Sequence, residues 1–291
     1  MLSSRADWTA GGQVASLVPG RSIFWRRDGD PDGDPVTLLH GFPTSSHDWE
    51  PMIPALTAAG FAVTTVDLLG FGASDKPTDH RFSIMEQASI VEALWEHCGV
   101  DGTAVMAHDY SVTVAQELLA RDPARITSMT FLNGGVYPDL HRPILVQRLL
   151  RSPLGRILGR FSSERMFRAA MDAITAEPLA REDLHELWLD ISTAGGQRIQ
   201  HDLLRYIDDR RQHAARWTAA MESYSGPVHC IWGPEDPISG AQVLERLRTR
   251  MPRAEFTALS GVGHYPHLED SPAVAEAMVA FLAAHRPQSR P

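Results

Sequence analysis

Cysteine is scarce in this sequence, and long hydrophobic runs are absent. Only two of the 291 residues are cysteines, Cys98 and Cys230, so there is no disulfide framework and both thiols are expected to be reduced and packed. No apolar run approaches the roughly 20 residues that a membrane-spanning helix needs, and no basic-then-apolar leader opens the chain. We therefore expect a cytoplasmic protein that does not insert into membranes.

The chain also lacks an excess of positive charge. Its 27 Lys and Arg residues stand against 36 Asp and Glu residues, which gives a net charge of −9. This balance argues against nucleic acid or an anionic membrane as a partner, so the expected partner is a small molecule. The sequence has no internal repeat. A homodimer is compatible with the sequence. With 43% hydrophobic residues, it can build one α/β domain or a core with a lid.

Two common catalytic patterns are missing as well. No G-x-S-x-G motif occurs, which argues against a serine esterase. Among 13 histidines there is no H-E-x-x-H motif, and the chain has no paired cysteine ligand set, so we predict no metal site. No other cofactor is predicted, because the glycine-rich loop at 69–77 lacks the spacing of a phosphate-binding loop.

The stretch 104–119 has the pattern of a strand, a sharp turn and a helix. Ala107 and Ser111 flank the turn and are small enough for strand and helix to approach each other, as a nucleophile elbow requires. Asp109 occupies the tip, where an esterase would carry serine. A carboxylate there indicates attack on an electrophilic sp³ carbon, with an ester as intermediate. The alternative is that Asp109 only caps the following helix.

Three other predicted strands end in candidate site residues. The strand 36–40 runs into the bend Gly41-Phe42-Pro43, which either supplies backbone donors for an oxyanion hole or only turns the chain into a helix. His40 is expected to orient this bend. Asp236 and His264 each follow a strand, and His267 is a rival for the catalytic base. The order of nucleophile, acid and histidine is that of the α/β-hydrolase fold, whose sites lie at the carboxyl edge of the sheet.

The alternation of strands and helices predicts an α/β fold: a mostly parallel central sheet with helices on both faces. Residues 1–136 form the first part of this core and 219–291 the second. Between them, 137–218 show helical periodicity without a convincing strand, which predicts an inserted helical cap. Within the core, Ser83 and Glu86 form a capping box that begins a helix. Residues 1 to about 20 are expected to be a loosely ordered lead-in.

These motifs resemble the aspartate-nucleophile branch of the α/β-hydrolase superfamily, which contains epoxide hydrolases and haloalkane dehalogenases. The resemblance is carried by His40 to Pro43, His108-Asp109, Trp232 to Pro237 and Gly263-His264, and it covers residues 36–285. Longer stretches are similar to the subgroup named for the mesoderm-specific transcript protein. They are 40–49, 69–77, 86–94, 108–119, 133–150 and 264–270.

The resemblance implies a two-step reaction. Asp109 attacks a substrate carbon in line, and the backbone N–H groups of Phe42 and Tyr110 form the oxyanion hole. His264, oriented by Asp236, then activates water to hydrolyse the ester.

The leaving group separates the two activities of the branch. Dehalogenases commonly place tryptophan after the nucleophile and asparagine in the bend, where this chain has Tyr110 and Phe42. Tyr206 is placed like one ring-opening tyrosine of epoxide hydrolases, although it could instead only pack its ring. The cap has no second such tyrosine, so Tyr137 or His141 is a candidate substitute, and Trp188 a candidate pocket residue. The expected activity is hydrolysis of an apolar epoxide to a vicinal diol. A haloalkane dehalogenase and a non-catalytic ligand-binding member are the alternatives.

Overall fold

In this computed structural model, which describes residues 1–152 and 155–286, eight strands form one sheet in the order β1-β2-β4-β3-β5-β6-β7-β8. β1 and β2 are antiparallel to their neighbours, and the other pairs are parallel. The sheet confirms the predicted mostly parallel α/β core. The strands are β1 (Gln13–Val18), β2 (Arg21–Asp28), β3 (Asp34–Leu39), β4 (Phe61–Val66), β5 (Thr103–His108), β6 (Ile126–Leu132), β7 (Val228–Trp232) and β8 (Glu255–Ala258).

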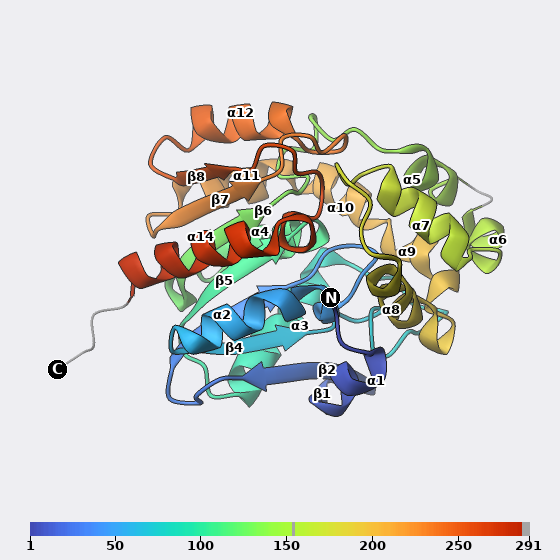
Figure 1. Ribbon diagram of the computed structural model, residues 1–291, viewed down its shortest axis with the longest axis horizontal. Coiled ribbons are helices and arrows are strands. Elements are labelled where there is room, and N and C mark those ends of the chain that lie inside the picture. Colours follow the sequence, from blue (N-terminus) through green and yellow to red (C-terminus); the bar gives the residue numbers. More distant parts are fainter. Residues whose placement is uncertain (153–154, 287–291) are drawn as a thin grey trace.

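The central strands of the sheet are buried from end to end because helices cover both of its faces. Every residue of β4, β5 and β7 is buried, as expected for parallel strands that read as continuous apolar runs. In Figure 1, α2 (Ile53–Ala58) and α14 (Ser271–Ala284) lie in front of the sheet. Their apolar side chains form one hydrophobic cluster. Helices α3 (Ile84–His97), α4 (Tyr110–Arg121), α11 (Ala214–Ser223) and α12 (Ala241–Arg250) contribute to another.

The first turn of α3 has one half of the predicted capping box, because the Glu86 carboxylate, which would complete it, lies 2.8 Å from His80 Nε2 instead. The Ser83 hydroxyl accepts a hydrogen bond from the Glu86 backbone N–H at 3.2 Å, and this bond satisfies a donor that has no partner inside the helix. The helix ends before Gly99, whose φ of +65° suits glycine.

The predicted cap consists of short helices gathered at one end of the sheet (Figure 1). They are α5 (Leu145–Leu150), α6 (Gly155–Arg160), α7 (Glu164–Asp172), α8 (Arg181–Ser192), η3 (Thr193–Arg198), α9 (Gln200–Leu203) and α10 (Tyr206–Gln212). Phe167, Met171 and Leu187 belong to a hydrophobic cluster that also contains Ile238 and Tyr265 of the core, so apolar packing joins the cap to the core. The expected boundary at residue 218 falls inside α11, which packs against α4 of the core.

The expectation of a loosely ordered lead-in is wrong. Residues 1–20 form α1 (Arg5–Ala10) and β1, the edge strand of the sheet. Trp8 is almost fully buried and stacks on the ring of His47, with 5.1 Å between ring centroids. The Leu2 backbone N–H donates to Asp183 of α8 at 2.7 Å. These contacts order a segment whose own sequence pattern is too short to reveal them. The remaining short helices are η1 (Ser46–Met52), η2 (Pro123–Arg125) and α13 (Pro266–Glu269).

A buried ionic contact joins η1 of the core to α8 of the cap. His47 Nδ1 lies 2.9 Å from Asp190 Oδ2, and the Ser45 hydroxyl donates to the same oxygen at 3.0 Å. Burial by itself would lower the pKa of His47, but hydrogen bonds and charges from Asp190 and Glu50 raise it to about 9. The protonated imidazole therefore stabilises the junction between core and cap.

This junction predicts a loss of stability at alkaline pH. The pKa of His47 rises from 6.5 to about 9 on folding, so its contribution is complete below pH 6.5 and disappears as the pH passes through about 9. We expect a loss of about 1 to 3 kcal/mol in the free energy of unfolding, measured by denaturant unfolding at about pH 6 and pH 9.5. Because His264 also titrates, the effect is the difference between the wild type and His47→Gln. Equal pH dependence in both proteins would contradict the assignment.

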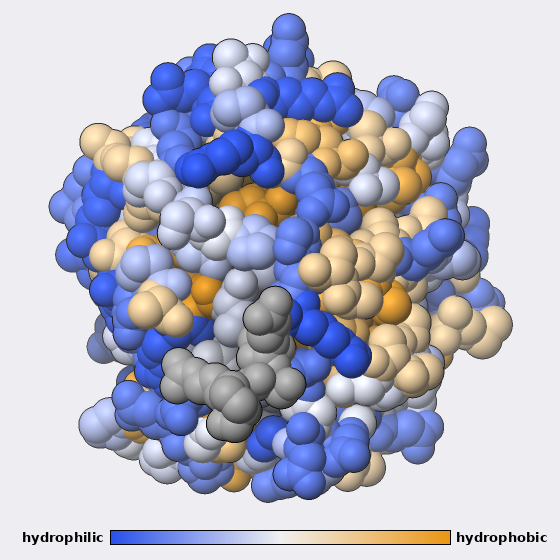
Figure 2. Space-filling view, turned by 90° about the vertical axis from the view of Figure 1, so that its left-hand side faces the viewer, coloured by the Kyte–Doolittle hydropathy of each residue, from blue (hydrophilic) through white to orange (hydrophobic). Residues whose placement is uncertain are grey.

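The face of the molecule turned away from the cap carries hydrophilic side chains that surround and separate its hydrophobic patches (Figure 2). Such a mixture is usual for a surface in contact with water. Within residues 1–152 and 155–286, no helix has both the length and the apolar character needed to cross a bilayer.

Candidate active site

Asp109 sits on a strained turn between β5 and α4. Its backbone adopts φ 43° and ψ −103°, in a region that costs a residue other than glycine about 1 to 3 kcal/mol. The flanking Ala107 and Ser111 are fully buried, and a Cβ on Gly134 would lie 3.0 Å from the Asp109 carbonyl oxygen. The Asp109 carboxylate makes no capping hydrogen bond to α4, so the interpretation as a helix cap does not explain its side chain. This geometry is that of a nucleophile elbow.

The bend after β3 aims a backbone donor at this carboxylate. The Phe42 N–H donates to Asp109 Oδ2 at 3.1 Å. Tyr110 is the first residue of α4, so its own N–H has no partner within the helix. His40 orients the bend, because its Nε2 accepts from the Leu68 N–H at 3.1 Å and its Nδ1 bonds the Gly41 carbonyl at 2.8 Å. The two N–H groups predicted for the oxyanion hole thus flank Asp109.

His264 lies between two carboxylates. Its Nδ1 is 2.7 Å from Asp236 Oδ2, and its Nε2 is 3.7 Å from Asp109 Oδ1. Asp236 also accepts from the Asn133 amide at 3.0 Å and from the Ser239 hydroxyl at 2.6 Å. The sequence analysis assigned no role to these last two residues, although Asn133 directly follows β6 and so carries the same strand-end signal as Asp109. The three predicted triad residues are brought together.

The three residues of this triad shift one another's pKa values. Burial opposes ionisation of Asp236, but the charge and hydrogen bond of His264 hold its pKa below the ordinary value. Burial would likewise lower the pKa of His264, yet Asp236 and then Asp109 raise it to about 9. Burial raises the pKa of Asp109. If Asp109 becomes an ester, one of the charges that keep His264 protonated disappears. His264 is therefore better suited to accept a proton after ester formation than before it.

A largely apolar cavity of about 130 Å³ reaches Asp109 and His264 from the cap. Trp188 and Gln200 are among its lining residues, and their side chains carry an indole N–H and an amide. The sequence analysis did not single out the other cap residues of the lining, because their apolar pattern does not distinguish a cavity wall from a packed core. They are Ile144, Leu149, Leu150, Ser162, Ser163, Met166, Phe167, Ala170, Met171 and Ile174.

The other proposed cap residues lie outside this lining. The Tyr137 hydroxyl donates to Glu222 at 3.1 Å, so it faces away from the cavity. His141 has no hydrogen-bond partner on either ring nitrogen among the described residues, and burial lowers its pKa to about 3. Tyr206 is fully buried against the ring of Tyr110, with 4.7 Å between centroids, and its hydroxyl has no partner in the described chain.

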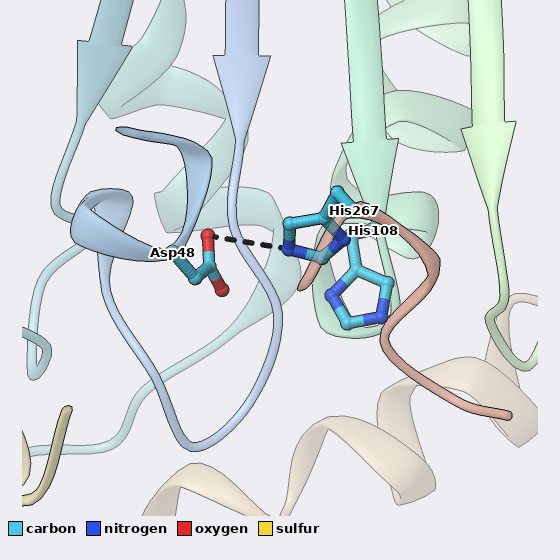
Figure 3. A group of neighbouring side chains, drawn as sticks. All are labelled: Asp48, His108 and His267. Carbon is cyan, nitrogen blue, oxygen red and sulfur yellow. Dashed lines mark ion pairs between the residues drawn. The ribbon is translucent and has the colours of Figure 1, made fainter. Parts of the chain in front are cut away.

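A second polar cluster consists of Asp48, His108 and His267 (Figure 3). His108 Nε2 is 2.8 Å from the His264 carbonyl oxygen, which can only accept, so Nε2 carries the proton and Nδ1 is left with its lone pair. His267 Nε2 lies 3.6 Å from Asp48 Oδ1, and its ring stacks on Trp49. His267 therefore belongs to this cluster, whereas His264 faces Asp109.

Asp48, His108 and His267 could hold a metal ion, since their ligand atoms all lie within 4.8 Å of one another. Within residues 1–152 and 155–286, this is the one group of three or more His, Cys, Asp or Glu side chains close enough to share an ion. Three ligands are one fewer than a structural zinc site uses. The sequence missed the cluster because its members come from three distant segments. Within this cluster, His108 directly supports the main chain of His264.

Comparison with known proteins agrees with this geometry. The family described as the alpha/beta hydrolase fold matches residues 34–271, and the chain belongs to that family. It is 38% identical to the Mycobacterium tuberculosis protein named "Putative hydrolase LipZ", over 95% of this chain and 97% of that protein. It is also 38% identical to the human mesoderm-specific transcript homolog protein, over 95% and 87%. The predicted resemblance to the mesoderm-specific transcript subgroup is thereby confirmed.

A solved structure shows the same fold. The haloalkane dehalogenase DbeA from Bradyrhizobium elkani superimposes with a TM-score of 0.82 at 20% identity, over 94% of this chain and 97% of that chain. Identity at this level supports the architecture alone. Together, the family and its members support hydrolase activity in general terms.

Proposed function

We propose that the protein is an epoxide hydrolase that opens a small apolar epoxide to a vicinal diol through an ester on Asp109. The observation that carries the proposal is the Tyr206 hydroxyl, which is buried without a hydrogen-bond partner in the described chain. Its ring packs on that of Tyr110, the residue after Asp109, and the Asp109 charge raises its pKa further. Burial is the larger cause of that raised pKa, and it keeps the phenol protonated as an acid requires. Tyr206 is not among the residues that line the cavity, so the proposal requires its hydroxyl to reach the cavity when it gives its proton to the substrate. The cytoplasmic location, the homodimer and the absence of a cofactor are retained as predictions.

In the first step, an Asp109 carboxylate oxygen attacks one epoxide carbon. The carbon–oxygen bond of the ring breaks, and its electron pair goes to the ring oxygen, which takes the proton of Tyr206. The products are an ester on Asp109 and a phenolate on Tyr206. The apolar cavity wall excludes water from the carboxylate, which favours attack by Asp109.

In the second step, His264 takes a proton from water, and the water oxygen attacks the Asp109 carbonyl carbon. The N–H groups of Phe42 and Tyr110 stabilise the resulting oxyanion. When the intermediate collapses, His264 returns the proton to the departing diol oxygen. The new Asp109 carboxylic acid gives its proton to Tyr206, so that both residues regain their initial state.

A haloalkane dehalogenase is the second candidate. The observation in its favour is that Trp188 and Gln200 line the cavity, because indole and amide N–H groups can hold a departing halide. Tyr110 directly after the nucleophile argues against the dehalogenase, because the dehalogenases of the branch commonly have tryptophan at this position. The same Asp109 chemistry serves both reactions.

Product analysis distinguishes the two candidates. Styrene oxide and aliphatic epoxides are assayed for diol, and brominated alkanes for released halide, with Asp109→Ala as the control. Diol formation that is lost in Asp109→Ala supports the proposal. Halide release without diol would replace it by the dehalogenase, and no turnover on either panel would favour a ligand-binding member of the fold.

Removal of the Tyr206 hydroxyl tests its role as the acid. Tyr206→Phe is expected to slow ester formation about 10²-fold, within the range for general acid catalysis, and to slow ester hydrolysis much less. Rapid-quench measurement of both steps gives the comparison. Tyr224→Phe is the matched control, because that hydroxyl donates to the Ile126 carbonyl, away from Asp109. Equal slowing of both steps would remove Tyr206 from the mechanism.

A further inference from the structure

Arg210 of α10 is a buried cation that has no counterion among the described residues. Its side chain is only 1% exposed, and no carboxylate of the described residues lies within ion-pair distance of it. Nη1 and Nη2 have no hydrogen-bond partner in that part of the chain. Buried charges are normally paired, because removing them from water is costly. The position of Arg210 therefore calls for a reason beyond packing.

Three neighbours fix the guanidinium at the edge of the active site. Nε donates to the Thr113 hydroxyl at 3.1 Å, one turn along α4 from Asp109. The central guanidinium carbon lies 4.7 Å from the ring centroid of Tyr206, four residues earlier on the same helix. A Cβ on Gly135 would lie 1.7 Å from Nη1, so a larger residue there would displace the guanidinium. The cation is thus held between the nucleophile helix and the proposed acid.

We propose that Arg210 supplies the second electrophilic function of ring opening, by stabilising the phenolate that forms when Tyr206 gives its proton to the substrate oxygen. The inference rests on the proposed epoxide hydrolysis. Arg210 acts through Tyr206 and is therefore a positioning residue. It takes the place of the second cap tyrosine that this chain lacks.

The charge balance of the site agrees with this role. Asp109 is faced by His264, by Arg210 and by the more distant Asp236, and the first two stabilise its charged form. Ester formation removes the negative charge of Asp109 and creates one on Tyr206. A fixed cation that lies against the Tyr206 ring and whose charge also acts on Asp109 stabilises negative charge before and after this transfer, and it needs no rearrangement during the step.

The first test measures ester formation in single turnover with styrene oxide, in a His264→Gln background that retains the ester. Arg210→Met is expected to slow ester formation about 10²-fold, which is the usual loss for one electrostatic donor. Arg210→Lys restores the charge and should remain within about 10-fold of the parent. Arg211→Met is the matched control, because the neighbouring Arg211 is exposed, and its rate should not change. A normal rate in Arg210→Met, or an equal loss in the lysine variant, would overturn the inference.

The second test needs no substrate. The Asp109 carboxyl is titrated by difference infrared spectroscopy, with Asp109→Asn as the reference. Loss of the cation in Arg210→Met should raise the pKa of Asp109 by about one unit or more, whereas Arg211→Met should not change it. An unchanged pKa would contradict the inference.

Together, the tests separate two failures. If the wild type forms diol but neither the rate nor the Asp109 titration responds to Arg210→Met, the inference alone fails. If the titration responds but no epoxide is opened, the proposed function fails, and the phenolate step fails with it.

Discussion

Replacement of Asp109 by alanine is expected to abolish turnover, with a loss of at least about 10⁴-fold in kcat. The nucleophile has no substitute, because His264 faces Asp109 from 3.7 Å and the Phe42 N–H is aimed at the same carboxylate. Activity is followed by diol release, and the fold by thermal unfolding. Stability should not fall by more than about 1 kcal/mol, since the substitution removes a buried charge as well as its hydrogen bond.

A second variant makes this result unambiguous. Asp109→Asn keeps the shape of the side chain and tolerates the positive φ of 43°, so a folded but inactive protein is expected. Slow recovery of activity on storage would indicate hydrolysis of the introduced amide back to the carboxylate, which mass spectrometry detects. Substantial activity in freshly prepared Asp109→Ala would refute its role as nucleophile.

Replacement of His264 by glutamine is expected to leave ester formation possible and to stop its hydrolysis. The reason is that His264 activates the water of the second step, whereas attack by Asp109 requires no base. Intact-protein mass spectrometry should show one added substrate mass per chain, and peptide mapping should locate it at Asp109. Steady-state turnover should fall by about 10³-fold or more.

The double variant His264→Gln/Asp109→Ala is the control, and it should carry no adduct. The absence of any adduct on His264→Gln, with a substrate that the wild type turns over, would indicate direct attack by water. An adduct on another residue would move the nucleophile away from the elbow.

The core could be predicted because its signals are local. A short apolar run predicts β5, apolar residues at helical spacing predict the helix after it, and the two patterns meet at Asp109. The Ser83 cap is likewise a pattern of four residues. Order along the chain then placed Asp236 and His264 at the same sheet edge. Trp8 shows the limit of such patterns, because its burial depends on His47, almost 40 residues further along the chain.

The cap was harder to predict, because its role depends on which face of each short helix turns toward Asp109. The sequence singled out Tyr206 but could not show that its hydroxyl is buried without a partner in the described chain. Arg210 stands four residues later among many arginines of the cap, and only its burial distinguishes it. Tyr137 illustrates the opposite case: its sequence position at the junction was suggestive, but its hydroxyl bonds Glu222.

The clustering of Asp48, His108 and His267 could not be predicted from sequence patterns either. His108 directly precedes the nucleophile, and it is the hydrogen bond of its ring to the His264 carbonyl that connects the elbow with the base. No spacing rule relates residues on η1, β5 and α13. Polar residues that are buried far apart in a sequence become a cluster only when the sheet brings their segments together.

The central claim is that Asp109 forms a covalent ester, and isotope transfer in a single turnover tests it most directly. Excess enzyme is mixed with an epoxide in water enriched in ¹⁸O, and both the diol and the peptide containing Asp109 are analysed by mass spectrometry. The account predicts that the first diol formed is unlabelled, because its new oxygen comes from Asp109, and that the label enters the Asp109 carboxylate. A labelled diol with an unlabelled Asp109 peptide would contradict it.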